Sequence, residues 1–363
     1  KAITVASQYI IDGDTSHISK TILDGSRSQN TDSASVVTLW SGEDTCSVLC
    51  GLTITGGKGT FIRNVHLNPS WRDLNYRAGG GILMKQSGGK IIHNIIENNH
   101  LTSGKESFGV NGCGLFATVD SAFPVIIRNN VIRGNTGKGR NGWGCGMTIR
   151  GAHYLVERNS ILKNVMDVEY ISIGGGLYYE FEPGGKIDRH TRIRNNVIAR
   201  NEVRSVDKLG GGGGIALSMG LEQIQTQVHH NIISENLAEG EGGALYGCMT
   251  SAWIYGNVIF NNVGTMYGDG FTWDFQNRIR MGNNLIWSGR IWIASPKGIA
   301  VLRRGSEGIA PFSKGMGIPI QSPTNACSID PLTGEICLGE KKGMISIWPY
   351  MLEPHAFTPP MVI

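Results

Sequence analysis

The sequence predicts an all-β solenoid of about seven or eight coils, each built from three short strands. The first observation is a short phrase that returns along the chain as IIHNIIENN, VIIRNNVIRGN, LVERNSILKN, RIRNNVIARN, VHHNIISEN, WIYGNVIFNN and IRMGNNLIWSG. The polar residues before the second apolar pair lie about 26 to 36 residues apart and are Asn94, Asn130, Ser160, Asn196, Asn231, Asn257 and Asn284. Such a period is typical of a solenoid, in which each repeat buries its core against its neighbours.

The second observation is the composition of each repeat. Its apolar runs are two or three residues long, rich in Val and Ile, and separated by Asn or Gly, which favours short strands joined by tight turns. A third run, opened by glycines, precedes each phrase as GGGILMKQ, GCGLFATV, GCGMTIRG, GGGLYYEF, GGGIALSM, GGALYGCM and GDGFTWDF. Because no window shows an apolar stripe of helical period, the sequence favours strands over helical repeats, and each repeat is predicted to be one turn of a parallel β-helix.

The third observation is the recurring Asn, for which we expect two roles. Asn tolerates the left-handed backbone of a tight corner better than other residues that carry a Cβ. Stacked coils would also place equivalent amides about 4.8 Å apart, so that each can hydrogen-bond the next in a buried ladder. Ser160 interrupts this ladder, and Asn159 beside it is the residue that could take its place.

These coils resemble the secreted right-handed parallel β-helix proteins of the pectate-lyase-like superfamily, over about residues 36–290. An earlier coil, SVVTLWSGEDTCSVLCGLTITGG, fits the same plan with Gly51 at the Asn corner. Right-handedness follows from the resemblance and from the general hand of parallel crossovers. The resemblance implies a secreted or cell-surface bacterial protein, and it leaves the activity open because one fold hosts many functions.

The chain is predicted to have two parts. Residues 1–290 form the β-helix, with ITVAS and TILDG as strands of a first coil that is partly missing. Residues 291–363 are rich in Gly and Pro without strand alternation, so we expect an irregular segment that caps the open end, anchored by Trp348, Tyr350 and Phe357.

Charge and composition restrict the partners. The formal net charge is +4 and the basic residues are dispersed along the sequence, so nucleic acid is not expected as a partner. No run of about 18 apolar residues exists, so no membrane span is expected. We expect a monomer or a face-to-face oligomer.

Two pairs among the seven cysteines are notable. Cys113 and Cys145 occupy the same place in consecutive glycine-opened strands, so they should stack inward, either as a buried thiol pair or as a disulfide. Cys327 and Cys337 bracket SIDPLTGEI and could close a loop outside the core.

Strand alternation divides the glycine-opened strands into inner and outer rows. The expected inner residues are Ile82, Leu115, Met147, Leu177, Ile215, Leu245 and Phe271, with Met84, Ala117, Ile149, Tyr179, Leu217 and Trp273. The expected outer residues are Leu83, Phe116, Thr148, Tyr178, Ala216, Tyr246 and Thr272, with Lys85, Thr118, Arg150, Glu180, Ser218, Cys248 and Asp274. An exposed surface of aromatic rings beside charges of both signs suits a carbohydrate, although aromatic residues also favour strands without any function.

Three functions fit this outer surface. The first is β-elimination of a uronate polymer, in which Arg150 or Lys85 would act as the base or would bind the carboxylate, with His153 nearby. β-helix lyases that resemble this chain use Arg or Lys in these roles, often with Ca²⁺, although no acidic cluster for a metal is evident here. The second is glycoside hydrolysis by Glu180 with a loop carboxylate, Asp167, Glu169 or Asp207. The third is a non-catalytic adhesin or structural solenoid.

The expected centre of the site is formed by Arg150, Tyr178 and Glu180, which lie on neighbouring coils with Cα atoms about 5 to 7 Å apart. We expect further substrate contacts from Phe116, Tyr246, Asp274, His153 and Trp143. The remaining strands look less distinctive. We therefore interpret their polar residues as ordinary structural or solvated groups: Arg128, Arg158, Arg194, Glu97, His93, His229 and His230.

Overall fold

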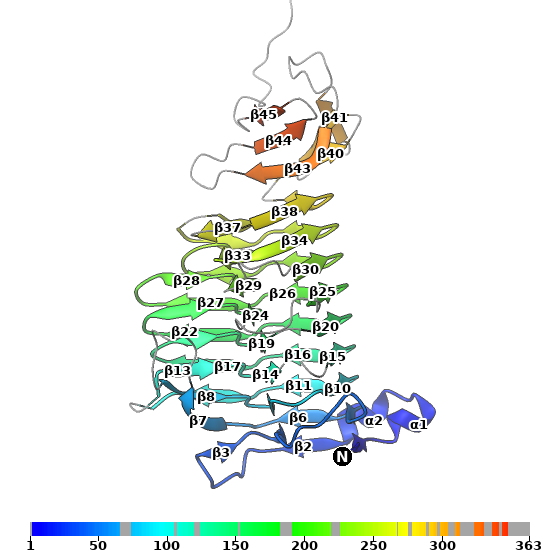
Figure 1. Ribbon diagram of the computed structural model, residues 1–363, viewed down its shortest axis with the longest axis vertical. Coiled ribbons are helices and arrows are strands. Elements are labelled where there is room, and N and C mark those ends of the chain that lie inside the picture. The colour runs from blue at the N-terminus through cyan, green and yellow to red at the C-terminus, as the bar shows by residue number, and fades with distance from the viewer. Residues whose placement is uncertain are drawn as a thin grey trace, which may run out of the picture.

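The computed structural model describes residues 2–65, 74–104, 107–119, 124–151, 153–181, 191–218, 226–266, 268–274, 278–287, 290–295, 298–303, 309–312, 323–329, 336–340 and 343–347. In these residues the protein is all-β, and most strands pair in parallel within sheets that run along a stack of coils (Figure 1).

Five sheets form the stack, and two of them lie on either side of a turn that carries asparagines. Sheet A contains, in order, β1 (Thr4–Ala6), β5 (Val48–Cys50), β10 (Gly89–Ile92), β15 (Val125–Arg128), β20 (Tyr154–Glu157), β25 (Arg192–Arg194), β30 (Thr226–His229), β34 (Ser251–Tyr255) and β38 (Arg278–Gly282). Sheet B contains β2 (Ile22–Asp24), β6 (Thr53–Thr55), β11 (Ile95–Glu97), β16 (Val131–Arg133), β21 (Ser160–Leu162), β26 (Val197–Ala199), β31 (Ile232–Ser234), β35 (Val258–Phe260) and β39 (Leu285–Trp287), followed by β40 (Arg290–Ser295), β41 (Gly298–Arg303) and β42 (Ile309–Phe312).

The other three sheets complete each coil. Sheet E contains β12 (His100–Thr102), β17 (Thr136–Gly139), β22 (Val165–Val168), β27 (Glu202–Ser205), β32 (Leu237–Ala238) and β36 (Val263–Gly264). Sheet C contains β28 (Leu209–Gly211), β23 (Ile171–Ile173), β18 (Gly142–Trp143), β13 (Gly109–Asn111), β8 (Leu74–Ala78), β7 (Gly59–Val65) and β3 (Ser33–Ala34). Sheet D contains β37 (Phe271–Asp274), β33 (Leu245–Cys248), β29 (Ile215–Ser218), β24 (Leu177–Glu180), β19 (Met147–Gly151), β14 (Leu115–Val119), β9 (Ile82–Lys85) and β4 (Val37–Leu39).

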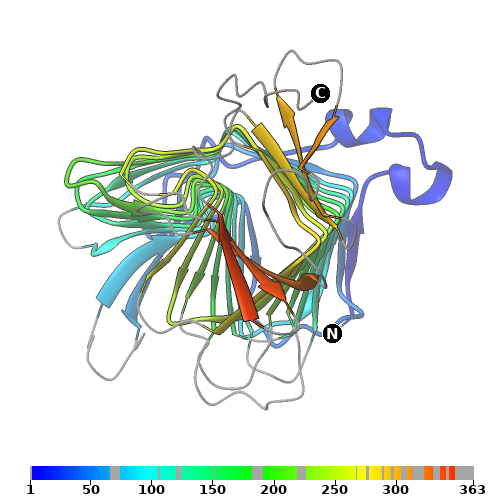
Figure 2. The ribbon, with the colours of Figure 1, turned by 90° about the horizontal axis from the view of Figure 1, so that it is seen from above.

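From β10 to β29 the chain passes through the sheets in a constant order, whereas the first coils have no strand in sheet E and the last described coils have none in sheet C. It runs from sheet A to B, E, C and D, and then returns to sheet A beside its own starting strand, as from β10 to β15. Sheets A, B and D enclose the main core, whereas sheets C and E lie back to back in a side arm (Figure 2). The sequence did not predict this arm, because its strands carry no repeated phrase.

The main core confirms the predicted inner rows. Every predicted inner residue from Ile82 to Leu245 belongs to one buried cluster, and Phe271 packs against it. The side chain of Trp273 lies outside the described residues. Alternation along the glycine-opened strands was therefore sufficient to identify the core, since a strand shifted by one residue would turn its apolar set to the other face.

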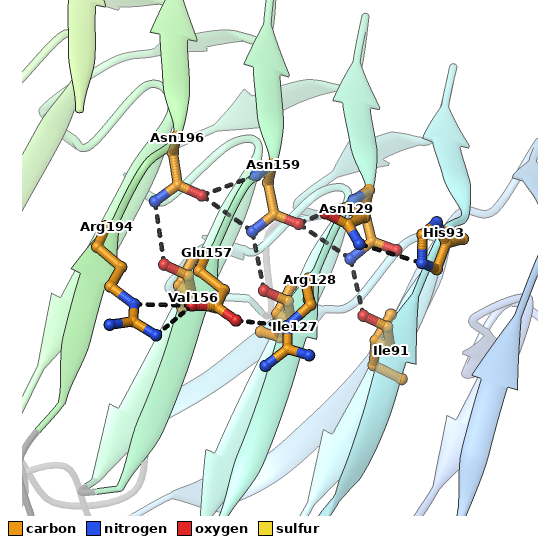
Figure 3. A network of polar contacts seen from close by, with 11 residues as sticks. Ile91, His93, Ile127, Arg128, Asn129, Val156, Glu157, Asn159, Arg194 and Asn196 are labelled. Atoms are coloured by element: carbon orange, nitrogen blue, oxygen red, sulfur yellow. Dashed lines mark hydrogen bonds and ion pairs between the residues drawn. The ribbon is translucent and has the colours of Figure 1, made fainter. Parts of the chain in front are cut away.

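The Asn ladder is present, and Asn159 takes the place that Ser160 vacates. Asn159 Nδ2 donates to Asn196 Oδ1 at 3.0 Å, and Asn130 Nδ2 donates to Asn159 Oδ1 at 3.0 Å (Figure 3). A second ladder, which the sequence analysis missed, follows one strand later and contains Asn99, Asn135, Asn164, Asn201, Asn236 and Asn262. The two ladders satisfy buried polar groups on both sides of sheet B.

The predicted backbone of the ladder residues was wrong. The left-handed residue is the one before each ladder Asn, for example Asn129 with φ 57° and Asn195 with φ 56°. The ladder Asn itself follows that corner, which lets its amide point inward to the next coil. Gly51, with φ 72°, occupies the same left-handed position in an earlier coil.

Glycine opens the strands of sheet D because the turn from sheet C to sheet D needs a left-handed backbone. Gly112 and Gly144 both have φ 56°, and a Cβ at Gly112 would lie 2.3 Å from the Leu115 carbonyl oxygen. A residue with a side chain would be strained at this turn.

The two ends differ from the regular coils. At the N-terminal end β1 and β2 pair in parallel with β5 and β6, which confirms ITVAS and TILDG as coil strands. Two short helices that were not predicted, α1 (Tyr9–Asp12) and α2 (Ser16–Lys20), connect them.

After β39 the described pairing becomes antiparallel, in β40–β42 and in the sheet of β43 (Pro323–Ile329), β44 (Ile336–Glu340) and β45 (Gly343–Ile347). The division at residue 290 stays a prediction. The predicted anchors Trp348, Tyr350 and Phe357 lie outside the described residues.

The cysteines whose side chains the structure describes, Cys46, Cys50, Cys113, Cys145 and Cys248, are free thiols. Cys113 and Cys145 are fully buried in the arm, and burial raises the pKa of the Cys145 thiol well above its usual value. The buried-pair alternative is therefore the one observed. The side chains of Cys327 and Cys337 lie outside the described residues.

Candidate functional site

The pairing register of sheet D brings the predicted site residues into one ladder. Lys85 pairs with Thr118, Thr118 with Arg150, and Arg150 with Glu180. The ladder continues through Ser218, Cys248 and Asp274, and we refer to these seven residues as the Arg150 row. The predicted adjacency of Arg150 and Glu180 on neighbouring strands is confirmed.

The other predicted outer row is not an exposed surface. Leu83 and Phe116 are fully buried, and Tyr178 is only 4% exposed. The side arm explains the burial, because Ile62 and Tyr76 of sheet C pack on Leu83 and Phe116 as a small separate core. Phe116 is therefore a core residue of the junction between sheets C and D, and the expectation that it forms a flat sugar platform was wrong.

Arg150 is the most unusual side chain of this junction, because it is charged and only 1% exposed. Its Nε lies 2.9 Å from Glu180 Oε2, and its NH2 group donates to Asn111 Oδ1 at 3.4 Å. The guanidinium carbon lies 5.3 Å from the Tyr76 ring and 5.5 Å from the Phe116 ring. A buried cation needs such partners, since losing its hydration costs several kcal/mol, of order 5.

Tyr178 and Glu180 complete the predicted centre. Burial raises the pKa of the Tyr178 hydroxyl well above its usual value, and the negative charge of nearby Glu180 raises it further. Tyr178 is therefore a protonated hydrogen-bond donor at neutral pH and is not suited to act as a base. Glu180 is 7% exposed and is neutralised by Arg150.

Lys85 lies at a more open part of the Arg150 row. Its side chain is partly exposed, and its Nζ lies 4.5 Å from the ring centroid of Trp40, which is 44% exposed. Trp40 is not among the residues predicted for the site. A signal was available, because Trp40 directly follows β4, the first strand of the sheet that carries Lys85.

The other predicted contact residues have separate positions. Trp143 stacks on Phe108 with ring centroids 5.8 Å apart in the side arm, and the half-buried Tyr246 has its ring against Gly211 of sheet C. His153 is half-buried with φ 73°, just before β20. The Asp274 backbone pairs with Cys248, and its side chain lies outside the described residues.

The carboxylates that hydrolysis would need are not among the described contacts of Glu180. Asp167 lies in β22 of sheet E, and Glu169 and Asp207 lie in the turns beyond strands of that sheet, all with exposed side chains. Glu180 instead lies in sheet D with its carboxylate on Arg150. The geometry therefore gives the hydrolase alternative no support.

The outward face of sheet A carries a second group of charged residues, of which Arg128 and Arg194 were expected to be ordinary solvated residues. Arg128, Glu157 and Arg194 pair with one another on successive strands (Figure 3). Each stands two residues before a ladder Asn, so alignment of the repeats on Asn159 instead of Ser160 would have revealed the column.

The same column contains His229, whose burial lowers the pKa to about 4, helped by the charges of His230, Arg194 and Arg192. The His229 ring stacks on Tyr255 at 4.7 Å, and its Nδ1 lies 2.8 Å from His230 Nδ1. The unfolded histidine has a pKa of about 6.5, so between about pH 6.5 and 4 the unfolded chain binds more protons at this residue. The stability due to this depressed pKa is thus complete above about pH 6.5 and is lost as the pH falls toward 4.

We therefore expect the melting temperature of the wild-type protein to fall across this window more steeply than that of His229→Gln. His100→Gln, which changes an exposed histidine of sheet E, is the matched control and should follow the wild type. Melting curves of the three proteins check this when they are recorded from about pH 7.5 to about pH 4, a range that spans both pKa values. Parallel slopes for wild type and His229→Gln would contradict it.

Neither a cluster of metal-ligating side chains nor a helix able to cross a membrane is found in the part of the chain that the structure describes. No three His, Cys, Asp or Glu side chains there are grouped so that they could hold a metal ion. None of the described helices has the length and apolarity of a membrane span.

Comparisons with protein-family models, curated proteins and solved structures give no significant match to this chain.

Proposed function

We propose that the protein is a right-handed parallel β-helix of the pectate-lyase-like type, secreted or at the cell surface, that binds an acidic polysaccharide along sheet D. The observation that supports this most is the pairing of a partly exposed cation, Lys85, with the exposed ring of Trp40 at one end of the Arg150 row. An aromatic ring covers the apolar face of a sugar, while a cation beside it binds a carboxylate.

The rest of the row supports an extended ligand. Its side chains repeat about every 4.8 Å along the stack, the strand spacing, and Thr118 and Ser218 are partly exposed on either side of Arg150 and Glu180. Lys85 and Arg150 are two strands apart, or about 10 Å. A polymer running along the stack would contact Lys85 and the partly exposed Thr118 and Ser218, above the buried Arg150–Glu180 pair.

Binding is better supported than β-elimination. An arginine side chain stays protonated in proteins, and Arg150 is bound to a carboxylate, so it would act electrostatically and not as a base. The Lys85 ammonium lies against the Trp40 ring, an attractive contact between a cation and an aromatic face. β-Elimination with Lys85 as the base would need this residue to lose its proton. The non-catalytic alternative is a protein that binds the polymer without cleaving it.

The test is a comparison of Lys85→Gln with Lys138→Gln, which removes an exposed lysine from sheet E of the side arm. Wild-type protein should bind polygalacturonate, alginate or a glycosaminoglycan, and Lys85→Gln should weaken binding about tenfold, as expected for one charged hydrogen bond. Ultraviolet absorbance of the unsaturated product, followed in the same samples, separates a lyase from a binding protein. Equal binding by both variants and the wild type would remove sheet D as the binding surface.

A further inference from the structure

The outward face of sheet A combines cations with aromatic rings in two columns, which we call the sheet A face. One column contains Ile92, Arg128, Glu157, Arg194, His229 and Tyr255, and the other contains Lys90, Ile126, Leu155, Arg192, Gln227, Trp253 and Arg280. Five of these residues are Lys or Arg and one, Glu157, is acidic. Five basic residues that are dispersed along the sequence are thus brought together on one face by the fold.

Two of the cations are fixed by one shared carboxylate. Arg128 Nε lies 2.5 Å from Glu157 Oε1, and an Arg194 NH2 nitrogen lies 2.7 Å from Glu157 Oε2 (Figure 3). Burial alone would raise the pKa of the Glu157 carboxyl, but the hydrogen bond from Arg194 and the charges of Arg128 and Arg194 lower it overall. One carboxylate neutralises one guanidinium, so the triad keeps a net positive charge and presents two oriented arginines that remain about one third exposed.

The other cations of the face are freer to meet a ligand. Arg192 and Arg280 have exposed side chains, and Arg192 lies two residues before Arg194 on the same face of β25. Charge therefore extends across the width of the sheet as well as along the stack.

The aromatic part of the face follows directly along the stack. Trp253 is 41% exposed, and its ring centroid lies 5.1 Å from that of Tyr255 on the same strand. His229 stacks flat on Tyr255, with an angle of 3° between the rings, which holds the tyrosine ring in place. An exposed ring beside a fixed ring is suited to the apolar face of a sugar.

The spacing suits an extended polymer. Arg194 lies two strands from Arg128 in sheet A, and Tyr255 lies two strands beyond Arg194. The two cations and the aromatic ring are therefore spaced about 10 Å apart along a straight line. We propose that the sheet A face binds an anionic glycan chain that runs parallel to the stack, with its carboxylate or sulfate groups on Arg128, Arg192 and Arg194 and a sugar ring on Trp253. A glycan is favoured over nucleic acid because the net charge of the chain is only +4, whereas nucleic-acid binding rests on many phosphate contacts.

This proposal does not rest on the site in sheet D. The two faces use different strands of each coil, and no residue belongs to both. The variants that test them are therefore independent. Loss of binding in Arg192→Gln with retention in Lys85→Gln would leave the sheet A face standing and remove sheet D, and the reverse pattern would remove the sheet A face.

The experiment uses Arg192→Gln/Arg280→Gln, which removes two exposed cations and leaves the Glu157 triad intact. Its matched control is Arg133→Gln/Arg200→Gln. This variant removes one exposed arginine at the end of β16 and another directly after β26 in sheet B. Each of the two is paired with an exposed or partly exposed glutamate. Affinities are measured for polygalacturonate, heparin and double-stranded DNA at several salt concentrations. Polygalacturonate and heparin distinguish carboxylate from sulfate as the bound group.

We expect the sheet A variant to lose about tenfold or more in affinity for at least one of the two glycans, with a weaker salt dependence, while the control loses less than about threefold. Trp253→Ala should weaken the same interaction with an unchanged salt dependence. Affinities of the sheet A variant equal to those of its control would overturn the proposal. Tighter binding of DNA than of either glycan, lost in the same variant, would replace the glycan by nucleic acid.

Discussion

Replacement of Asn196 by Ala is expected to lower the free energy of unfolding by about 4 kcal/mol. Buried polar groups would lose their hydrogen-bond partner, at a cost of about 1 to 3 kcal/mol each. Asn196 Nδ2 donates to the Val156 carbonyl oxygen and to Asn231 Oδ1. Its Oδ1 accepts hydrogen bonds from the backbone nitrogen and Nδ2 of Asn159. Alanine would remove the ladder bonds to the Val156 carbonyl oxygen and to the Asn159 backbone nitrogen, both of which are buried. It would also remove one of the bonds of Asn159 Nδ2 and of Asn231 Oδ1, so the loss spreads to the coils on both sides.

The neighbouring residue provides a matched control. Asn195 has an exposed side chain and a left-handed backbone, with φ 56°. Asn195→Gly removes the same amide and keeps the required backbone, so its unfolding free energy should change by less than about 1 kcal/mol. Urea unfolding of both variants measures the difference. Similar losses for Asn195→Gly and Asn196→Ala would show that the ladder is not what stabilises the stack.

Replacement of Arg150 by Met is expected to cost about 3 to 5 kcal/mol, because Glu180 would keep a buried charge without its partner. The double variant Arg150→Met/Glu180→Met should recover most of that loss, since a buried ion pair is often no more stable than apolar residues of similar size. This differs from the expectation for an exposed site, in which substitution of Glu180 would change binding and leave stability unchanged.

The exposed pair of Arg200 and Glu235 is the control for this prediction. Its guanidinium and carboxylate are 2.8 Å apart, with about half of each side chain exposed, so Arg200→Met should cost at most about 1 kcal/mol. Urea unfolding of the three variants separates the two cases. A double variant as unstable as Arg150→Met alone would contradict the view that the unpaired charge of Glu180 causes the loss.

The repeat was enough to predict the coils, the inner rows of sheet D and the register that pairs Arg150 with Glu180. These features depend on alternation and on spacing within one repeat, both of which are visible in the residues themselves. Asn159 was recognised as the substitute for Ser160 for the same reason. The second Asn ladder was missed although it too is periodic, because only the first polar residue of each phrase was aligned.

What could not be predicted depends on contacts between segments that share no pattern. The burial of Phe116 and Arg150 comes from Tyr76 and its neighbours in the side arm, whose strands differ from coil to coil. The sheet A face, by contrast, follows the repeat, because Arg128, Glu157 and Arg194 each stand two residues before a ladder Asn. It was overlooked because one repeat was aligned on Ser160 instead of Asn159.

The most direct test of the proposed function compares two forms of one polymer, polygalacturonate and its fully methyl-esterified form, in which the backbone is the same and the negative charges are removed. Isothermal titration with the wild-type protein should give binding to the acid form that weakens with salt, and at least about tenfold weaker binding to the ester. Equal affinity for the two forms, or binding to neither of them nor to alginate and heparin, would contradict an acidic polysaccharide as the ligand.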